Sequence, residues 1–189
     1  MVKSLIEKAF REIDRGDFVL EKYRNQTDLD IPLPIGFGQT ISQPTTVRMM
    51  LEWLDVQLGD KVLDVGSGSG WTSALLAEIV GEVGKVYAVE RIPELKELGQ
   101  KNCENLGIKN IQFYLAEEKV FGLPKFAPYD RILVSASGDN LPQELIDQLK
   151  IGGKMVIPIG NAIFEISKKS KSDIDINEHY GFVFVPLIK

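Results

Sequence analysis

Short runs of apolar residues alternate with amphipathic stretches along most of the chain after residue 60. Short apolar runs bounded by turn residues predict buried strands, and apolar residues at helical spacing predict the helices between them. The predicted strands are 61–65, 85–90, 110–115, 130–135, 154–157, 162–168 and 180–187, and the predicted helices between them are 71–80, 93–105 and 142–149. Repeated strand–helix units with short loops favour a doubly wound parallel sheet. The fold class is therefore α/β, with a Rossmann-like, mostly parallel seven-stranded sheet that ends in a C-terminal antiparallel hairpin.

The residues before this alternating region follow a different pattern. Apolar residues recur at helical spacing over 5–13 and predict a short amphipathic helix. Residues 25–38 are rich in proline, glycine and polar residues and predict an irregular segment. A second helix is expected at 45–58, with Ser42 as its N-cap and Pro44 in its first turn.

Composition and charge narrow the class of protein. The chain has 189 residues, of which 44% are hydrophobic, and suits one domain over 1–189, with 1–58 as a helical extension and 59–189 as the α/β core. Its net charge of -5 argues against a nucleic-acid partner, and no apolar run reaches the length of a membrane-spanning helix. One cysteine, Cys103, and one histidine, His179, exclude a disulfide framework and a Cys- or His-rich metal site. We expect a cytoplasmic monomer without a bound metal.

A glycine-rich turn follows the first strand of the core. Gly66, Gly68 and Gly70 allow a tight turn and let a ligand lie against bare backbone. Their spacing is not the dinucleotide fingerprint, and the Lys-Ser/Thr pair of a triphosphate loop is missing, so S-adenosylmethionine fits better. Glu90, which ends the second strand, can accept two hydrogen bonds from a ribose diol, while Asp64 can orient the loop or meet a cationic ligand group through water. The alternative is a glycine turn that binds nothing, which many α/β proteins have.

Longer motifs carry a more specific resemblance. VLDVGSGSGWTSALLA at residues 62–77 resembles the first motif of the class I methyltransferases. GFGQTISQP at 36–44, PYD at 128–130, LPQELIDQLKIGGKMVIPIG at 141–160 and FVPL at 184–187 resemble the protein-L-isoaspartate O-methyltransferase family. These motifs cover nearly the whole chain in order, and the Q-T-I-S-Q-P block is specific to that family.

The resemblance implies a reaction and a set of site residues. The reaction is methyl transfer from S-adenosylmethionine to the α-carboxylate of isoaspartyl residues in damaged proteins, whose ester collapses to a succinimide and reopens partly as aspartate. Ser42 matches the family's active-site serine, and Thr40 lies beside it next to the substrate carboxylate. The implied cofactor-binding residues are Gln39, Thr40, Ile41, Ser42, Asp64, Gly66, Ser67, Gly68, Gly70, Glu90, Arg91, Ala116 and Glu117.

Methyl transfer to a carboxylate does not require acid–base side chains. A carboxylate is already ionised at neutral pH and needs no general base before it attacks a methyl group. In-line displacement from a sulfonium mainly requires positioning and exclusion of water. Hydroxyls such as those of Thr40 and Ser42 hold a carboxylate without quenching its charge, so a chain with one histidine and one cysteine suffices.

Two departures from the family pattern affect the expected site. Residues 116–118 read Ala-Glu-Glu where the family has Gly-Asp-Gly. Glu117 keeps the carboxylate that lies near the adenine amino group, but we expect a reshaped adenine site. The chain stops at Lys189, so we expect a more open pocket than in relatives with a C-terminal extension. Two alternatives stay open: a methyltransferase with a different acceptor, and a non-catalytic protein that binds the cofactor.

Several other side chains are expected to be structural. Cys103 has no recognisable partner base, and His179, at the start of the last predicted strand, is not expected to be catalytic. Trp53 and Trp71 favour packing over ligand stacking, although Trp71 lies closer to the glycine turn. The lysine-rich residues 168–171 predict a solvated hairpin turn.

Overall fold

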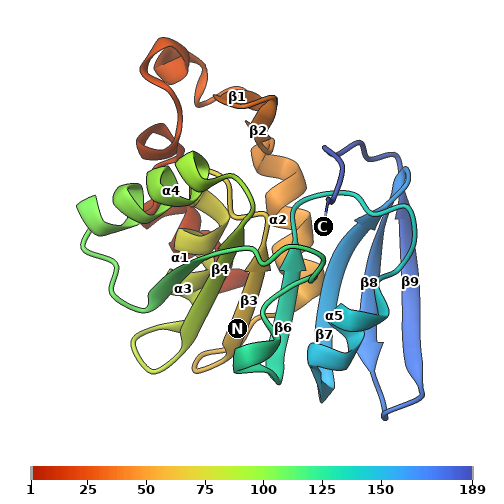
Figure 1. Cartoon of the computed structure of the whole chain (residues 1–189). Helices are drawn as coiled ribbons and strands as arrows, with labels where there is room; N and C mark the ends of the chain where they lie inside the picture. The colour runs from red at the N-terminus through yellow and green to blue at the C-terminus, as the bar shows by residue number, and fades with distance from the viewer. Residues whose placement is uncertain (1, 189) are drawn as a thin grey trace.

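A computed structural model describes residues 2–188, and a seven-stranded sheet in the order β5-β4-β3-β6-β7-β8-β9 forms its centre (Figure 1). Neighbouring strands are parallel from β5 to β7 and antiparallel from β7 to β9. The strands are β3 (Lys61–Val65), β4 (Lys85–Glu90), β5 (Ile111–Leu115), β6 (Tyr129–Val134), β7 (Leu149–Ile159), β8 (Ala162–Lys168) and β9 (Ile174–Tyr180). The predicted α/β fold, with its mostly parallel sheet and antiparallel C-terminal end, is confirmed.

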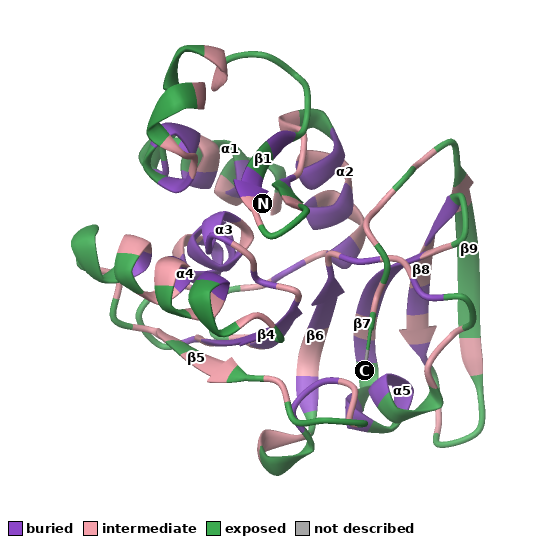
Figure 2. Cartoon of the chain, turned by 45° about the horizontal axis from the view of Figure 1, so that its top comes forward, coloured by how far each residue is buried: buried purple, intermediate pink, exposed green. Residues whose placement is uncertain are grey.

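Helices cover the two faces of the sheet unequally. The side chains of Val62 and Val86 lie in one core cluster, together with apolar residues of α1 (Val2–Glu12), α2 (Pro44–Leu54), α3 (Trp71–Val80) and α4 (Pro93–Asn105). The next residues, Leu63 and Tyr87, lie in the opposite cluster, under α5 (Gln143–Gln148) and the short 3-10 helix Pro124–Phe126. The central strands are therefore buried on both faces, as Figure 2 shows. Such strands are continuous apolar runs, so their bounds were readable from the sequence.

The chain order of the strands creates a crevice at the carboxyl ends of the central strands. From β3 the chain moves outward to β4 and β5, and then returns to β6 on the other side of β3. The connections after β3 and β6 therefore leave the sheet in opposite directions. Ligands of open α/β sheets bind at such a switch point, beyond the carboxyl ends of the strands.

A β-hairpin replaces part of the irregular segment predicted for residues 25–38. β1 (Leu33–Gly36) pairs antiparallel with β2 (Gln39–Ile41), through a two-residue loop in which Phe37 and Gly38 have φ of 53° and 71°. Positive φ at both loop residues is the requirement of a type I′ turn. The prediction failed because both strands are very short and β1 contains Pro34. The short 3-10 helices Arg15–Phe18 and Glu21–Gln26 precede the hairpin.

The helix after the hairpin is shorter than predicted and has a different cap. α2 spans Pro44–Leu54 instead of 45–58, because Asp55 adopts the left-handed conformation with φ of 54°. Gln43, and not Ser42, is the N-cap residue, and its side chain makes no capping hydrogen bond. The backbone N–H of Thr45 donates instead to Oδ1 of Asp30, at 2.8 Å. The cap is thus supplied by a residue 15 positions earlier, which local sequence patterns do not reveal.

The last strand was predicted in the wrong place. β9 spans Ile174–Tyr180, in the segment predicted as a polar loop, and residues 181–188 contain no strand. β9 is the edge of the sheet and mostly exposed (Figure 2), so polar residues are compatible with it. The apolar run over 180–187 reflects instead a segment that packs back over the molecule, where Phe182 and Phe184 contact the core. β7 also extends well beyond the predicted 154–157, through a glycine-containing irregularity in its pairing with β6.

Lys168 is buried, so the prediction of a solvated turn over 168–171 is wrong at its first residue. Its Nζ donates to the backbone oxygens of Ile146 and Leu149, at 2.6 and 2.7 Å. These carbonyls belong to the end of α5 and the start of β7. Lys168 therefore adds a donor at the C-terminal end of α5, where the carbonyl of Ile146 also accepts from the N–H of Leu149.

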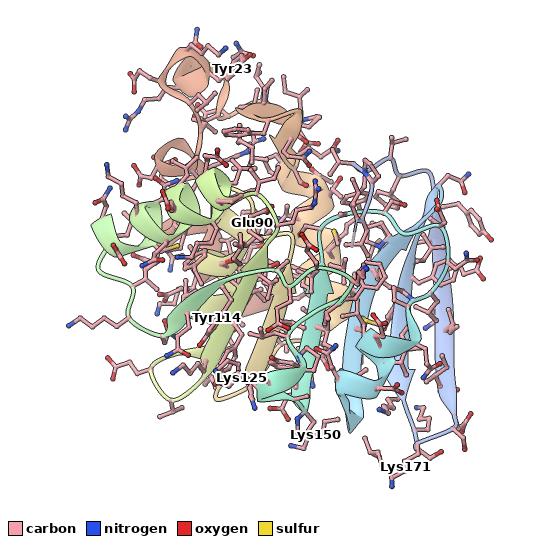
Figure 3. The ribbon with its side chains drawn as sticks, in the orientation of Figure 1. Tyr23, Glu90, Tyr114, Lys125, Lys150 and Lys171 are labelled. Atoms are coloured by element: carbon pink, nitrogen blue, oxygen red, sulfur yellow. The ribbon has the colours of Figure 1, made fainter. Side chains whose placement is uncertain are left out.

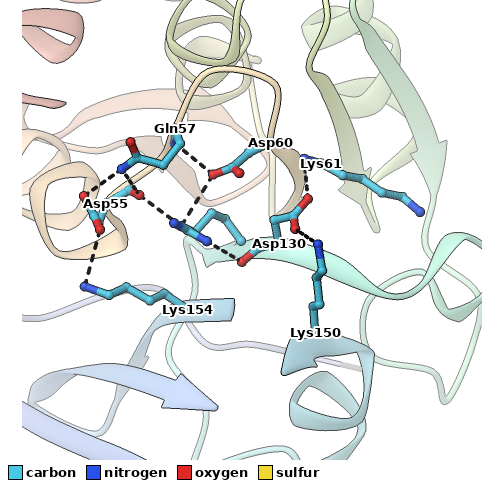
Figure 4. A network of polar contacts seen from close by, with 8 residues as sticks. Asp55, Gln57, Asp60, Lys61, Asp130, Lys150 and Lys154 are labelled. Atoms are coloured by element: carbon cyan, nitrogen blue, oxygen red, sulfur yellow. Dashed lines mark hydrogen bonds and ion pairs between the residues drawn. The ribbon is translucent and has the colours of Figure 1, made fainter. Parts of the chain in front are cut away.

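A network of charged residues connects the amino ends of the strands, opposite the crevice (Figure 4). Nε of Arg131 in β6 donates to the backbone oxygen of Asp55, at 3.0 Å, and lies 3.5 Å from Oδ2 of Asp60. Nζ of Lys150 in β7 lies 2.7 Å from Oδ1 of Asp130. The network joins the end of α2 to the amino ends of β3, β6 and β7, and lies away from the crevice.

Candidate functional site

A cleft lies at the carboxyl ends of β3, β4 and β6, at the switch point of the sheet. Ten predicted site residues line it: Gln39, Thr40, Ile41, Ser42, Gly66, Ser67, Gly68, Glu90, Arg91 and Ala116. The β1–β2 hairpin and the glycine turn, which are separated by more than 20 residues in sequence, thus form walls of one cleft.

The glycine turn is held against the end of β4 by backbone hydrogen bonds. The N–H groups of Gly66 and Ser67 donate to the carbonyl of Val89, at 2.8 and 3.2 Å. Gly70 has φ of 91°, and a Cβ there would lie 2.8 Å from the carbonyl oxygen of Gly99 in α4. Gly70 therefore serves the packing of α4 against the turn, and it does not line the cleft.

Glu90 completes the attachment of the turn (Figure 3). Its Oε2 accepts from the N–H of Gly68 at 2.9 Å, and its Oε1 accepts from the N–H groups of Arg91 and Ile92 at 2.8 and 3.0 Å. The side chain is 6% exposed and lines the cleft. A carboxylate has about four acceptor positions, so Oε2 keeps capacity for a ligand hydroxyl.

Asp64 lies behind the glycine turn and does not line the cleft. It is fully buried, and its Oδ2 accepts from the hydroxyls of Ser73 at 2.6 Å and Thr72 at 3.1 Å. Burial raises the pKa of Asp64 to about 6, although these hydrogen bonds act to lower it. Of the two roles expected for Asp64, orienting the loop is the one that its contacts fit, because both donors belong to the start of α3.

The expected adenine end differs from its prediction. Ala116 lines the cleft, whereas Glu117 is exposed and does not. The wall continues instead through Val120, Phe121 and Gly122, in the loop after β5. These apolar groups suit the flat face of a nucleobase. The loop has no periodic pattern, so no local signal in the sequence predicted them.

The C-terminal segment forms another wall of the cleft. Val185, Pro186, Leu187 and Ile188 line it. The expectation of a pocket more open than in relatives with a C-terminal extension stays a prediction. Ser137 holds this segment: its N–H donates to the carbonyl of Val185, and its carbonyl accepts from the N–H of Leu187, both at 2.8 Å. Residues of the FVPL motif thus line the cleft, which the apolar character of the motif alone did not indicate.

Two buried polar atoms in the cleft wall have no hydrogen-bond partner among the described residues. They are Oγ of Ser67 and Nε1 of Trp71. Buried polar groups are normally satisfied, so both atoms are available to a bound molecule. Trp71 also packs edge-on against Phe10, with ring centroids 5.7 Å apart, so the expected packing role is present together with its position in the cleft. The polar turn, the partly used carboxylate and the apolar loop together fit a nucleoside without phosphate.

The remaining reactive side chains lie outside the cleft. Burial raises the pKa of the Cys103 thiol to about 12, and its Sγ contacts the carbonyl of Gly70 at 3.6 Å. His179 stacks on Trp53, with ring centroids 3.8 Å apart, and both residues lie outside the cleft lining. Within residues 2–188, no group of three or more His, Cys, Asp or Glu side chains is placed to hold a metal ion. None of the helices in this part of the chain is long and apolar enough to cross a membrane.

Comparison with known proteins identifies close relatives over the whole chain. Residues 1–189 match the family model described as Protein-L-isoaspartate(D-aspartate) O-methyltransferase (PCMT). The chain is 45% identical over 188 residues to the protein-L-isoaspartate O-methyltransferase of Pyrococcus horikoshii, covering 97% of this chain and 84% of the relative. It is 46% identical over 189 residues to the enzyme of the same name from Fervidobacterium nodosum, covering 98% of this chain and 94% of the relative.

Solved structures give the same result. A protein-L-isoaspartate O-methyltransferase structure superposes with a TM-score of 0.89 at 31% identity, over 98% of this chain and 62% of that one. This chain therefore spans less than two thirds of that protein. A Plasmodium falciparum structure, described as a beta-aspartate methyltransferase (PCMT) in complex with S-adenosyl-L-homocysteine, superposes with a TM-score of 0.82 at 26% identity, over 98% of this chain and 97% of that one.

Proposed function

This chain belongs to the protein-L-isoaspartate O-methyltransferase family, and on that premise we propose how its cleft methylates isoaspartyl residues of damaged proteins. The family uses S-adenosylmethionine, which supplies an electrophilic methyl group when bound. The product on the acceptor is a methyl ester, the first step of protein repair. The observation that carries the proposal is that the Thr40–Ser42 segment and the glycine turn with Glu90 line the same cleft.

The glycine turn and Glu90 hold the cofactor in this proposal. The remaining acceptor position on Oε2 of Glu90 receives a ribose hydroxyl, and Oγ of Ser67 provides a further polar contact. Ala116 and Phe121 provide apolar surface for the adenine. Because three backbone N–H groups already fix the Glu90 carboxylate, it needs no rearrangement to bind.

The hydroxyls of Thr40 and Ser42 position the acceptor carboxylate. Both residues line the cleft, Thr40 exposed at its mouth and Ser42 half-buried. Their hydroxyls donate to the carboxylate while it keeps its charge, so it remains nucleophilic without a general base. The apolar segment Val185–Ile188 and Ile35 limit access of water to the same space.

The proposal is tested by transfer of labelled methyl from S-adenosylmethionine to an isoaspartyl peptide. The same peptide with normal aspartate is the control for the acceptor. We expect label on the isoaspartyl peptide alone, released slowly as methanol. Label on neither peptide, with cofactor binding intact by calorimetry, contradicts the proposed acceptor.

Ser42→Ala tests the role of the hydroxyl. We expect kcat to fall about tenfold to a hundredfold through misplacement of the acceptor, with little change in cofactor affinity. Thr45→Ala is the matched control, because Thr45 is an exposed hydroxyl residue on α2 outside the cleft lining. Full turnover by Ser42→Ala removes Ser42 from its proposed role.

We also infer that the protein is a cytoplasmic monomer that acts on isoaspartyl proteins and not on nucleic acid. Its net charge of -5 supports the exclusion of nucleic acid. The proposed domain is the whole chain, since residues of 1–58 such as Ile6 and Leu51 share a core cluster with the sheet of 59–189. Light scattering at several protein concentrations tests the monomer, and a mass of two chains contradicts it.

A further inference from the structure

Arg15 is a buried arginine whose hydrogen bonds go to backbone carbonyl oxygens and not to carboxylates. It follows α1, is 5% exposed, and makes all four of its hydrogen bonds to carbonyl oxygens. Nη1 donates to Thr27 and Leu29, both at 3.2 Å, and Nη2 donates to Ile31 at 2.7 Å and Ser42 at 3.1 Å. Within residues 2–188 its guanidinium forms no ion pair; burial lowers its pKa, and the charge of Asp30 acts to raise it.

The carbonyls of Ile31 and Ser42 lie at the two ends of the β1–β2 hairpin. One nitrogen, Nη2, therefore joins both ends and closes the hairpin at its base. Asp30 strengthens the same junction, because its carboxylate caps the N–H of Thr45 at the start of α2. The residues between the two ends include Gln39 and Thr40, which line the cleft.

The guanidinium also contacts the other wall of the cleft. Cζ of Arg15 lies 5.5 Å from the ring centroid of Trp71, at cation–π distance. Trp71 directly follows Gly70 and begins α3, and it lines the cleft itself. A single side chain thus links the hairpin that carries Ser42 to the element that begins after the glycine turn.

A contribution to stability alone does not explain why an arginine is buried at this position. Burying the charge is costly even with the carboxylate of Asp30 acting on it, and apolar residues of similar volume often replace buried ionic groups without loss of stability. What an apolar side chain cannot do is hold four carbonyls in a fixed arrangement. The planar five-donor fork of arginine is suited to this, and the single ammonium of lysine is not.

We propose that Arg15 is a positioning residue that fixes the Ser42 hairpin at the distance from the cofactor turn that methyl transfer requires. The structural part of this proposal is that Arg15 fixes the hairpin, and the hydrogen bonds described above support it. Its kinetic part rests on the proposed function. Arg15 does not line the cleft, so it acts through Ser42 and Trp71 and not on the substrate.

The structural part is tested by hydrogen exchange, which needs no acceptor. We compare the wild type with Arg15→Met, which keeps the length of the chain, and Arg15→Lys, which keeps the charge. Arg48→Met is the control, because Arg48 lies in the same region, pairs with Glu7 and stacks over Phe10 without touching the Ser42 segment. We expect amides 33–46 to exchange at least about tenfold faster in both Arg15 variants and unchanged in the control.

The kinetic part is tested with the isoaspartyl peptide. We expect kcat/KM for the peptide to fall about a hundredfold in Arg15→Met and nearly as far in Arg15→Lys, with the dissociation constant of S-adenosylhomocysteine within about threefold of the wild type. Unchanged kcat/KM in a folded Arg15→Met protein, or full activity in Arg15→Lys, overturns the proposal. An equal loss of cofactor binding and turnover also overturns it, since that indicates general unfolding.

The two proposals fail in different ways. If the wild type does not methylate the peptide, the proposed function fails while the exchange experiment still decides whether Arg15 fixes the hairpin. If the wild type is active and exchange over 33–46 is the same in all variants, only the role of Arg15 fails.

Discussion

Phe37 occupies a backbone conformation that disfavours its own side chain. It has φ of 53° in the turn of the β1–β2 hairpin and is 58% exposed, so packing does not compensate for the strain. Left-handed backbone costs about 1–2 kcal/mol for most residues, and asparagine tolerates it best after glycine.

Phe37→Asn is therefore expected to raise the free energy of unfolding, by about 0.5–1 kcal/mol. Urea unfolding monitored by circular dichroism measures the change. Phe10→Asn, at a partly buried position that packs on Trp71, is the contrasting variant and should lower stability. A loss of stability in Phe37→Asn contradicts the strain.

Asp64 gives the stability a specific dependence on pH. Its pKa is about 6 in the folded protein, above the ordinary value of 3.8, because burial disfavours the charged form. Between these two pH values the folded state holds a proton that the unfolded state has released. Stability from this group is therefore complete below pH 3.8 and is lost as pH rises through 6.

Asp64→Asn should remove that dependence. Relative to the wild type, its free energy of unfolding should increase between pH 4 and 7, on the order of 2 kcal/mol, and the increase should level off above pH 7. Urea unfolding at four pH values measures this. Asp139→Asn, at an exposed carboxylate, is the control and should follow the wild type throughout. A constant difference between Asp64→Asn and the wild type contradicts the raised pKa.

The site residues that the sequence predicted are those with a local signal. Gly66, Gly68 and Glu90 belong to a turn and a strand end whose spacing is visible in the chain. Arg15 and Asp30 act on residues 12 to 27 positions away, and nothing in their neighbourhood indicates a partner. Glu117 is the opposite case: the sequence placed a carboxylate there, but the residue is exposed and does not line the cleft.

At the level of elements, Lys168 connects β8 to the end of α5. Lys168→Met should remove the ammonium donor from the carbonyls of Ile146 and Leu149, of which Ile146 keeps the N–H of Leu149, and lower the free energy of unfolding, by about 2 kcal/mol. Lys169→Met is the control next to it: its Nζ is exposed and pairs with Asp175, so its removal should cost about 0.5 kcal/mol or less. Thermal and urea unfolding of both variants decide the matter. Equal stability of the two variants contradicts the structural role of Lys168.

The contrast between β3 and β9 explains which elements were predictable. β3 is buried on both faces, so hydrophobicity alone determined Lys61–Val65. β9 receives its structure from pairing with β8, and its residues are exposed except for Ile174 and His179, which are half-buried. An exposed edge strand carries little apolar signal, whereas the segment 181–188 carries one without being a strand.

At the level of the whole molecule, the Arg131 network and the cleft lie at opposite ends of the strands. Arg131→Met should break the contacts to Asp55 and Asp60 and lower the free energy of unfolding, by about 2 kcal/mol. The affinity for S-adenosylhomocysteine should not change, since the network lies at the amino ends of the strands. Calorimetry and urea unfolding on the same preparation test both statements.

Lys150→Met is the control for the network end of the strands. Its Nζ is exposed and pairs with Asp130, so the expected cost is below about 1 kcal/mol. If Arg131→Met weakens cofactor binding as much as it weakens the fold, the two ends are coupled.

The turn between β8 and β9 has a practical use. Lys171 lies at the end of the sheet away from Glu90 (Figure 3), and the backbone of Lys169 and Ser170 closes the turn on Asp173. A dye or a surface linker attached at position 171 is thus held on a short, ordered turn, with the cleft facing the free solution. An immobilised enzyme oriented in this way keeps its entrance open to substrates as large as a folded protein.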